Sequence, residues 1–180
     1  MRVRKILVIL GLLLGVAQFI QGSSSPAMAK VRLAREAVIQ VEASTLRAIQ
    51  AVFHQAEEAI RTGDLEALME LYSQNYRFDG LTKDDRRRSW KDLFTQYHRI
   101  STAHSFSQIV VKPGKHATVE VTSTGTLWAT TNGTNQRINL AIWLGDIHYL
   151  IDEEGQWRIS GPGKKAARTA QHGWAPPSPF

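Results

Sequence analysis

The first half of the chain places its hydrophobic residues at helical spacing. We predict helix over residues 30–62, most clearly after Ser44, since apolar side chains recur at i, i+3, i+4, i+7 and i+11. These side chains are Ile49, Val52, Phe53, Ala56 and Ile60. Gly63 is suited to end this helix and Asp64 to cap a second, shorter one. Two helices separated by this Gly-Asp pair are predicted to turn back on each other.

A third helix is predicted to begin at a charged stretch, residues 82–88. Thr82 and Asp85 have the spacing of an N-terminal cap, and Asp85 falls in the first turn, where the helix dipole favours negative charge. Successive helical side chains point about 100° apart. The three arginines at 86–88 therefore cannot converge on one phosphate. The stretch predicts a capped amphipathic helix with a solvated charged face rather than a phosphate site.

After Ile100 the apolar and polar residues alternate, as they do in strands. Strands are predicted in the segments 106–111, 116–131, 136–151 and 156–160, with Asn132-Gly133 as a hairpin turn. Gly125 and Gly145 are predicted sites of β-bulges. Helices that precede strands indicate an α+β domain. We expect three N-terminal helices packed on a strongly curved antiparallel sheet of about four strands.

Both ends of the chain differ from this pattern. Residues 1–29 combine basic residues, an apolar run and the small-x-small pattern Ala27-Met28-Ala29, which is the order of a secretory signal peptide. We expect cleavage after Ala29 and a periplasmic or extracellular protein. The alternative is an uncleaved N-terminal anchor, which would be the only link to a membrane. Residues 163–180 have no sustained period and are expected to form a flexible tail.

Charge and composition exclude several classes of function. Without residues 1–29 the chain has 19 basic against 16 acidic residues, because Arg2, Arg4 and Lys5 leave with that segment. A charge so close to neutral argues against a nucleic-acid binder. The chain has no cysteine, and its six histidines show no close ligand spacing. We therefore expect no metal site, and no motif indicates a cofactor.

Three stretches carry a resemblance to a known superfamily. They are "AIRTGDLEALMELYSQNYRFDG", "TKDDRRRSWKDLF" and "DEEGQWRIS". With the long hairpin between them, they make residues 45–162 resemble the NTF2-like or SnoaL-like superfamily, after an N-terminal helical extension at 30–44. The resemblance implies a cone with a pocket between the concave face of the sheet and the helices. It also implies a dimer through the sheet. This fold carries isomerases, cyclases and dehydratases as well as binding modules, so it does not choose an activity.

Three residues are candidates for acid–base chemistry in such a pocket. Asp79 follows the second helix, where members of the superfamily often carry a pocket or rim group, although Asp-Gly is also a common turn. Asp146 and His148 lie two apart on one strand and point to the same face. They form a minimal acid–base pair, unless they mark a strand end that faces solvent.

Aromatic residues are the candidates for lining the pocket. Tyr72 and Tyr76 could offer phenol donors, or belong to the core of a helical stripe. Trp128 lies on a threonine-rich strand face that could line the pocket, form a dimer surface or be exposed. The complete predicted lining is Tyr72, Tyr76, Trp90, Phe94, Trp128 and Trp143.

Together these features predict a binding domain. We expect an exported NTF2-like domain, homodimeric, that binds a small hydrophobic ligand or a protein partner in or around a cone-shaped pocket. No convergent catalytic set is visible. The alternative is a SnoaL-like isomerase, cyclase or dehydratase that uses a pocket carboxylate or His as general acid or base. A third possibility is a cell-envelope assembly factor that docks through its basic tail.

Overall fold

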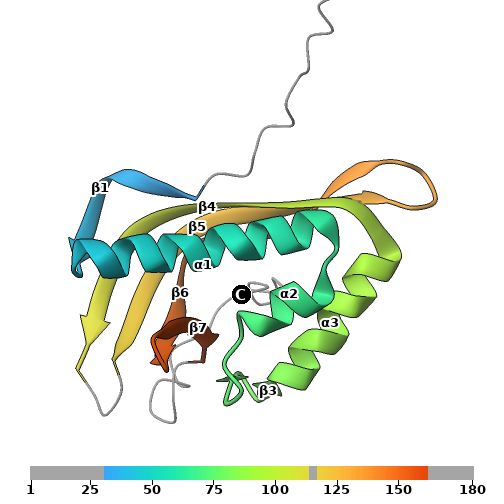
Figure 1. Ribbon diagram of the computed structural model, residues 1–180. Helices are drawn as coiled ribbons and strands as arrows, with labels where there is room; N and C mark the ends of the chain where they lie inside the picture. Colours follow the sequence, from blue (N-terminus) through green and yellow to red (C-terminus); the bar gives the residue numbers. More distant parts are fainter. Residues whose placement is uncertain (1–30, 114–116, 162–180) are drawn as a thin grey trace, which may run out of the picture.

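Helices cover one face of a curved sheet in the computed structural model, which describes residues 31–113 and 117–161 (Figure 1). The helices are α1 (Ala43–Thr62), α2 (Leu65–Glu70) and α3 (Lys83–Gln96). The five-stranded sheet has the order β1-β4-β5-β6-β7. Its strands are β1 (Arg32–Gln40), β4 (Tyr97–Lys112), β5 (Thr118–Thr131), β6 (Arg137–Glu153) and β7 (Gln156–Ser160). A separate two-stranded ribbon pairs β2 (Arg77–Phe78) with β3 (Leu81–Thr82). The α+β prediction is confirmed.

The predicted helical extension at 30–44 is wrong. Residues Arg32–Gln40 form β1, which pairs parallel with β4, so the sheet has five strands and is mixed rather than antiparallel throughout. α1 begins only at Ala43. Pairing satisfies the backbone groups that the edge of β4 would otherwise leave open, and this tertiary gain outweighs a local helical preference.

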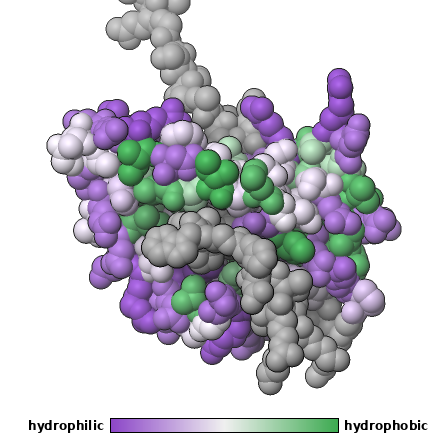
Figure 2. Space-filling view, turned by 180° about the vertical axis from the view of Figure 1, so that it is seen from behind, coloured by the Kyte–Doolittle hydropathy of each residue, from purple (hydrophilic) through white to green (hydrophobic). Residues whose placement is uncertain are grey.

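The sheet alternates between a buried inner face and an outer face. Along β5 the inner side chains include Val119, Val121, Leu127 and Ala129, which are all buried. They belong to the same hydrophobic core as the apolar stripe of α1, which includes Ile49 and Phe53. On β6 the outer face carries exposed apolar residues, Ile142, Leu144 and Ile147. Figure 2 shows the molecule from behind, with hydrophobic residues gathered in a band among polar ones.

The two predicted bulges have different outcomes. At Gly145, which has φ 82°, the pairing of β5 with β6 shifts between Ser123 and Thr124, so this bulge is confirmed. The prediction at Gly125 is wrong, because its pairing with His104 and Trp143 is regular. Gly125 instead leaves room for the Trp143 ring, which lies where a Cβ atom would be.

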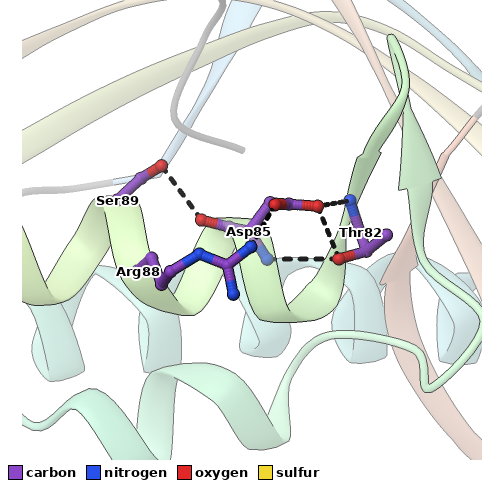
Figure 3. A network of polar contacts seen from close by, with 4 residues as sticks. All are labelled: Thr82, Asp85, Arg88 and Ser89. Atoms are coloured by element: carbon purple, nitrogen blue, oxygen red, sulfur yellow. Dashed lines mark hydrogen bonds and ion pairs between the residues drawn. The ribbon is translucent and has the colours of Figure 1, made fainter.

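The caps form as the sequence predicts. Gly63 ends α1 in the left-handed conformation, and the Asp64 side chain accepts a hydrogen bond from the backbone of Ala67. Thr82 and Asp85 form a reciprocal capping box at α3 (Figure 3). The Thr82 N–H donates to Asp85 Oδ2 at 2.7 Å and the Asp85 N–H donates to Thr82 Oγ1 at 3.2 Å.

The two end segments of the sequence analysis, residues 1–29 and 163–180, lie outside the described residues. Within the part that the structure describes, no helix has the length and hydrophobicity needed to span a membrane.

Candidate functional site

A carboxyl group and an imidazole meet in the interior between α1 and the sheet. Glu57 lies on the buried face of α1, in the same stripe as Phe53 and Ile60, and is only 4% exposed. His104 points inward from β4 and is 2% exposed. Glu57 Oε1 lies 3.0 Å from His104 Nδ1, within hydrogen-bond distance.

Burial sets the protonation of this pair. Loss of hydration raises the pKa of Glu57 to about 7, and the same effect lowers the pKa of His104 to about 3. At neutral pH the imidazole is therefore uncharged and the carboxyl is close to half protonated. A group with this pKa can both accept and release a proton near pH 7.

A second hydrogen-bonded chain lies beside the pair. The Trp143 indole Nε1–H donates to Ser123 Oγ at 3.0 Å, and the same oxygen lies 2.7 Å from His148 Nε2. Ser123 is fully buried, and His148 is 3% exposed. A hydroxyl with two lone pairs and one proton can serve both neighbours.

Ring contacts join the two groups into one cluster. The His104 ring lies 5.0 Å from the Trp143 ring and 6.1 Å from the His148 ring, centroid to centroid. Phe53 packs edge-on against both imidazoles, at 5.2 and 5.5 Å. We refer to Glu57, His104, Ser123, Trp143 and His148 as the interior cluster.

Two buried oxygens at the inner face lack hydrogen-bond partners among the described residues. They are Glu57 Oε2 and Thr102 Oγ1. The imidazole nitrogen His54 Nδ1 lies 3.8 Å from Glu57 Oε2, beyond hydrogen-bond distance. Such atoms are uncommon in native interiors and each requires an explanation.

The predicted acid–base residues lie in different parts of the structure. Asp79 occupies an exposed turn between β2 and β3 with φ 48°, so the structure corrects its assignment to the pocket: it is a turn residue. Asp146 is half-buried and shares the inner side of β6 with His148, and burial raises the pKa of its carboxyl. The oxygen atom within hydrogen-bond distance of His148 Nε2, however, is the hydroxyl oxygen of Ser123 and not a carboxyl oxygen of Asp146.

Most of the predicted aromatic residues gather in a second group, at α2 and α3. Tyr72 and Tyr76 pack edge-on at 5.1 Å, and Trp90 packs against Phe94 at 5.7 Å. The Trp90 indole N–H donates to the Tyr72 hydroxyl at 3.3 Å. Burial raises the pKa of both tyrosines, so their hydroxyls remain protonated.

Arg86 belongs to this second group, which corrects the prediction of a solvated charged face. Its side chain is 4% exposed, and its Nε–H donates to the Tyr76 hydroxyl at 2.9 Å. By contrast, Arg87 and Arg88 form ion pairs near the surface, with Glu66 and Asp85 respectively.

The two other tryptophans of the predicted pocket lining, Trp128 and Trp143, lie on opposite sides of the sheet. Trp143 points inward and belongs to the interior cluster. Trp128 lies on the opposite face of β5 from the buried Leu127 and Ala129, with the Arg137 guanidinium 4.9 Å from its ring centroid. Its assignment to the pocket is therefore wrong, because the pleat turns it outward.

A surface groove of about 950 Å³ lies away from the interior cluster. It runs between α2, the start of α3 and the β6–β7 turn, with charged residues such as Lys83, Glu153 and Arg158 in its wall. Within the described ranges, no group of three or more His, Asp or Glu side chains is placed to hold a metal ion.

Sequence reasoning missed Glu57 and His104, although both left a signal. Glu57 is at i+4 from Phe53, inside the stripe that defines the buried face of α1. His104 alternates with Thr102 and Phe106 on the inner side of β4. A polar residue at a position that the pattern assigns to the core is a candidate for function.

Comparisons with known proteins place the fold. No family model and no curated protein sequence matches the chain. A conserved protein from Planctomyces limnophilus is similar in structure with a TM-score of 0.58 at 15% identity, over 67% of this chain and 94% of that one. A ketosteroid isomerase-like protein from Erwinia carotovora atroseptica matches with a TM-score of 0.52 at 16% identity, over 67% and 94% of the two chains. A proposed dehydratase of the NTF2-like family from Streptomyces avermitilis matches with a TM-score of 0.52 at 12% identity, over 67% and 95%.

The chain has the NTF2-like fold. These identities are low, so the likeness establishes the NTF2-like architecture and leaves the activity to the residues of the site.

Proposed function

We propose that this NTF2-like domain binds a small, mainly apolar molecule inside the cone, with one hydroxyl or carbonyl group of the ligand directed at Glu57 and His104. The observation that carries this proposal is the buried Glu57–His104 contact at 3.0 Å in a largely apolar interior. A buried carboxyl costs free energy unless it is hydrogen-bonded. A ligand group that bonds to it would offset that cost.

The two oxygens that lack partners support a polar group on the ligand. Each buried acceptor without a hydrogen bond costs about 1–3 kcal/mol, and Glu57 Oε2 and Thr102 Oγ1 are such atoms within the described residues. The rings of Phe53 and Phe106, 4.8 Å apart, would contact the apolar body. Because side chains occupy this interior in the structure, binding moves at least one ring.

Titration with 2-naphthol, an aromatic molecule with one hydroxyl, tests the proposal. We expect saturable binding to the wild type and affinity about tenfold weaker for Glu57→Gln, since a hydrogen bond to a charged group contributes about 1.5 kcal/mol or more. The matched control is Glu58→Gln, which changes the exposed neighbour of Glu57. Equal affinity of both variants, or no binding by the wild type, would contradict the proposal.

A second candidate function, proton transfer, is favoured by the pKa of Glu57 at about 7. Under this candidate Glu57 acts as general base on a substrate in the cone. Elimination of 5-nitrobenzisoxazole, which needs only a positioned base, should then follow an apparent pKa near that of Glu57. The reaction should be lost in Glu57→Gln. A rate equal to that of buffer would exclude this candidate for the described interior.

We also propose that the domain is a homodimer that pairs through the outer face of β6. Ile142, Leu144 and Ile147 are 54%, 78% and 42% exposed there. Apolar side chains grouped on one face indicate an interaction surface. Figure 2 shows hydrophobic residues in a band on this side of the molecule.

We further propose that the protein is exported and that residues 1–29 are removed. The support is the order of basic, apolar and small residues in that segment. Intact mass of the protein recovered from a bacterial periplasm or culture medium should correspond to a chain that begins at Lys30. A mass that retains residues 1–29 would favour the N-terminal anchor.

A further inference from the structure

Arg86 is a buried cation that the interior cluster does not use. It lies in the first turns of α3 and is 4% exposed. Its Nε–H donates to the Tyr76 hydroxyl, and its guanidinium carbon lies 5.7 and 5.9 Å from the ring centroids of Tyr76 and Phe78. Its Nη2 atom is buried and has no hydrogen-bond partner among the described residues.

Within the described ranges, no acidic side chain forms an ion pair with Arg86. All 16 acidic residues lie in the ranges that the structure describes. The arginine and lysine ion pairs there join Arg61, Arg87, Arg88 and Lys112 to their partners, and none includes Arg86. The positive end of the α3 dipole adds to the cost of a cation in this position. A buried charge without a counterion is strongly unfavourable.

We propose that Arg86 binds the carboxylate of a small aromatic acid. Tyr76 occupies the Nε–H, which leaves Nη2 free to donate to an incoming oxygen. A planar guanidinium edge matches a carboxylate, which can accept two parallel hydrogen bonds. Among the described residues, the guanidinium also lies near the neutral rings of Tyr76 and Phe78, so its single positive charge matches a monoanionic carboxylate better than a phosphate dianion.

The aromatic neighbours of Arg86 favour a ligand whose apolar part is an aromatic ring. The rings of Tyr76 and Phe78 flank the guanidinium, and an aromatic acid can pack against them while its carboxylate reaches Nη2. Phe78 belongs to the β2–β3 ribbon, whose two strands are joined by two residue pairs. Local opening of so short a ribbon provides the route to the buried edge.

Calorimetric titration of the full chain with benzoate tests this proposal, with benzamide as the neutral analogue of the same shape. We expect the wild type to bind benzoate and to bind benzamide at least about 30-fold more weakly, because only benzoate pairs with the charge. Equal binding of both probes, tighter binding of inorganic phosphate than of benzoate, or no binding of benzoate would overturn the proposal.

Variants separate a binding role from a structural one. Arg86→Met keeps the length of the side chain and removes the charge, so the unliganded variant should unfold at a Tm no lower than that of the wild type while losing benzoate binding. Arg86→Lys keeps the charge without the planar fork and should weaken benzoate binding roughly tenfold or more. This second variant keeps the test decisive if the methionine variant does not fold.

A control variant links the effect to this arginine. Arg88→Met, which changes an exposed arginine on the same helix, should bind benzoate like the wild type. If Arg88→Met loses benzoate binding as fully as Arg86→Met, the anion is held by general surface charge and the proposal fails.

Discussion

Glu57 links the chemistry of the interior to the stability of the fold. Its pKa is raised to about 7 by burial, so between the ordinary carboxyl pKa and this value the folded protein holds a proton that the unfolded chain releases. Folding stability from this group is fully present at low pH and is lost as the pH rises through about 7. His104 acts in the opposite sense, because its pKa is lowered to about 3 and its contribution is lost as the pH falls below its ordinary value.

We predict that Glu57→Gln removes the Glu57 part of this pH dependence and leaves the His104 part. The difference in unfolding free energy between the variant and the wild type should shift in favour of the variant by on the order of 2 kcal/mol from pH 5 to pH 8. Urea denaturation at the two pH values measures this difference, with Glu58→Gln as the exposed control. An equal difference at both pH values would contradict the raised pKa.

A second prediction concerns Gly125, which supports the Trp143 ring. A Cβ atom there would collide with the Trp143 ring and with the backbone oxygen of Ala103. Gly125→Ala should therefore destabilise the fold by about 2 kcal/mol, the cost of overpacking a filled core. Gly133→Ala is the control, since no atom lies within 4 Å of its added Cβ. Chemical denaturation of both variants checks this, and equal stability would mean that the ring can move aside easily.

The hydrophobic pattern of the sequence can single out some of the buried polar residues but not others. Glu57 and His104 occupy core positions of a helix and a strand, so periodicity could have singled them out. Arg86 could not be found that way. It lies between two acidic residues and two further arginines along the chain. Only the packing of Tyr76 and Phe78 around it makes it differ from its neighbours.

At the scale of secondary-structure elements, local sequence signals predicted where helices begin and end, but they did not predict the edge strand β1. Gly63, Asp64 and Thr82 act through neighbours a few residues away, so their roles are readable from the sequence. β1 exists because it pairs with β4, whose paired residues begin more than 70 positions later. A distant partner of this kind leaves little trace in the segment itself.

We predict that Thr82→Ala weakens α3 and the ribbon before it. The substitution removes the hydroxyl that accepts the Asp85 N–H and should cost about 1 kcal/mol of stability. Thr95→Ala, an exposed change near the other end of α3, is the matched control. Thermal unfolding monitored by circular dichroism compares them, and a Thr82 variant as stable as the control would show that the cap contributes nothing.

At the scale of the whole molecule, the two faces of the sheet differ in burial. The inner face holds the core and the interior cluster. The outer face of β6 leaves Leu144 78% exposed beside Ile142. The α+β order predicted this division. The register, which decides that Trp128 points outward and Trp143 inward, depends on the Gly145 bulge and on long-range pairing.

We predict that Leu144→Asp shifts the proposed homodimer to monomer, because a carboxylate buried in a symmetric apolar interface would face its own copy. Sedimentation velocity at several concentrations measures the change. The control Thr95→Asp, at an exposed position of α3, should leave the dimer intact. A wild type that sediments as a monomer at all concentrations would refute the dimer.

The most direct test of the cone as a binding site is a crystal structure of residues 30–180 grown with 2-naphthol. We predict density for the naphthyl rings between α1 and the sheet, with the hydroxyl within hydrogen-bond distance of Glu57 and at least one interior ring moved. Density for 2-naphthol only in a surface groove, with the interior cluster unchanged, would contradict ligand binding inside the cone.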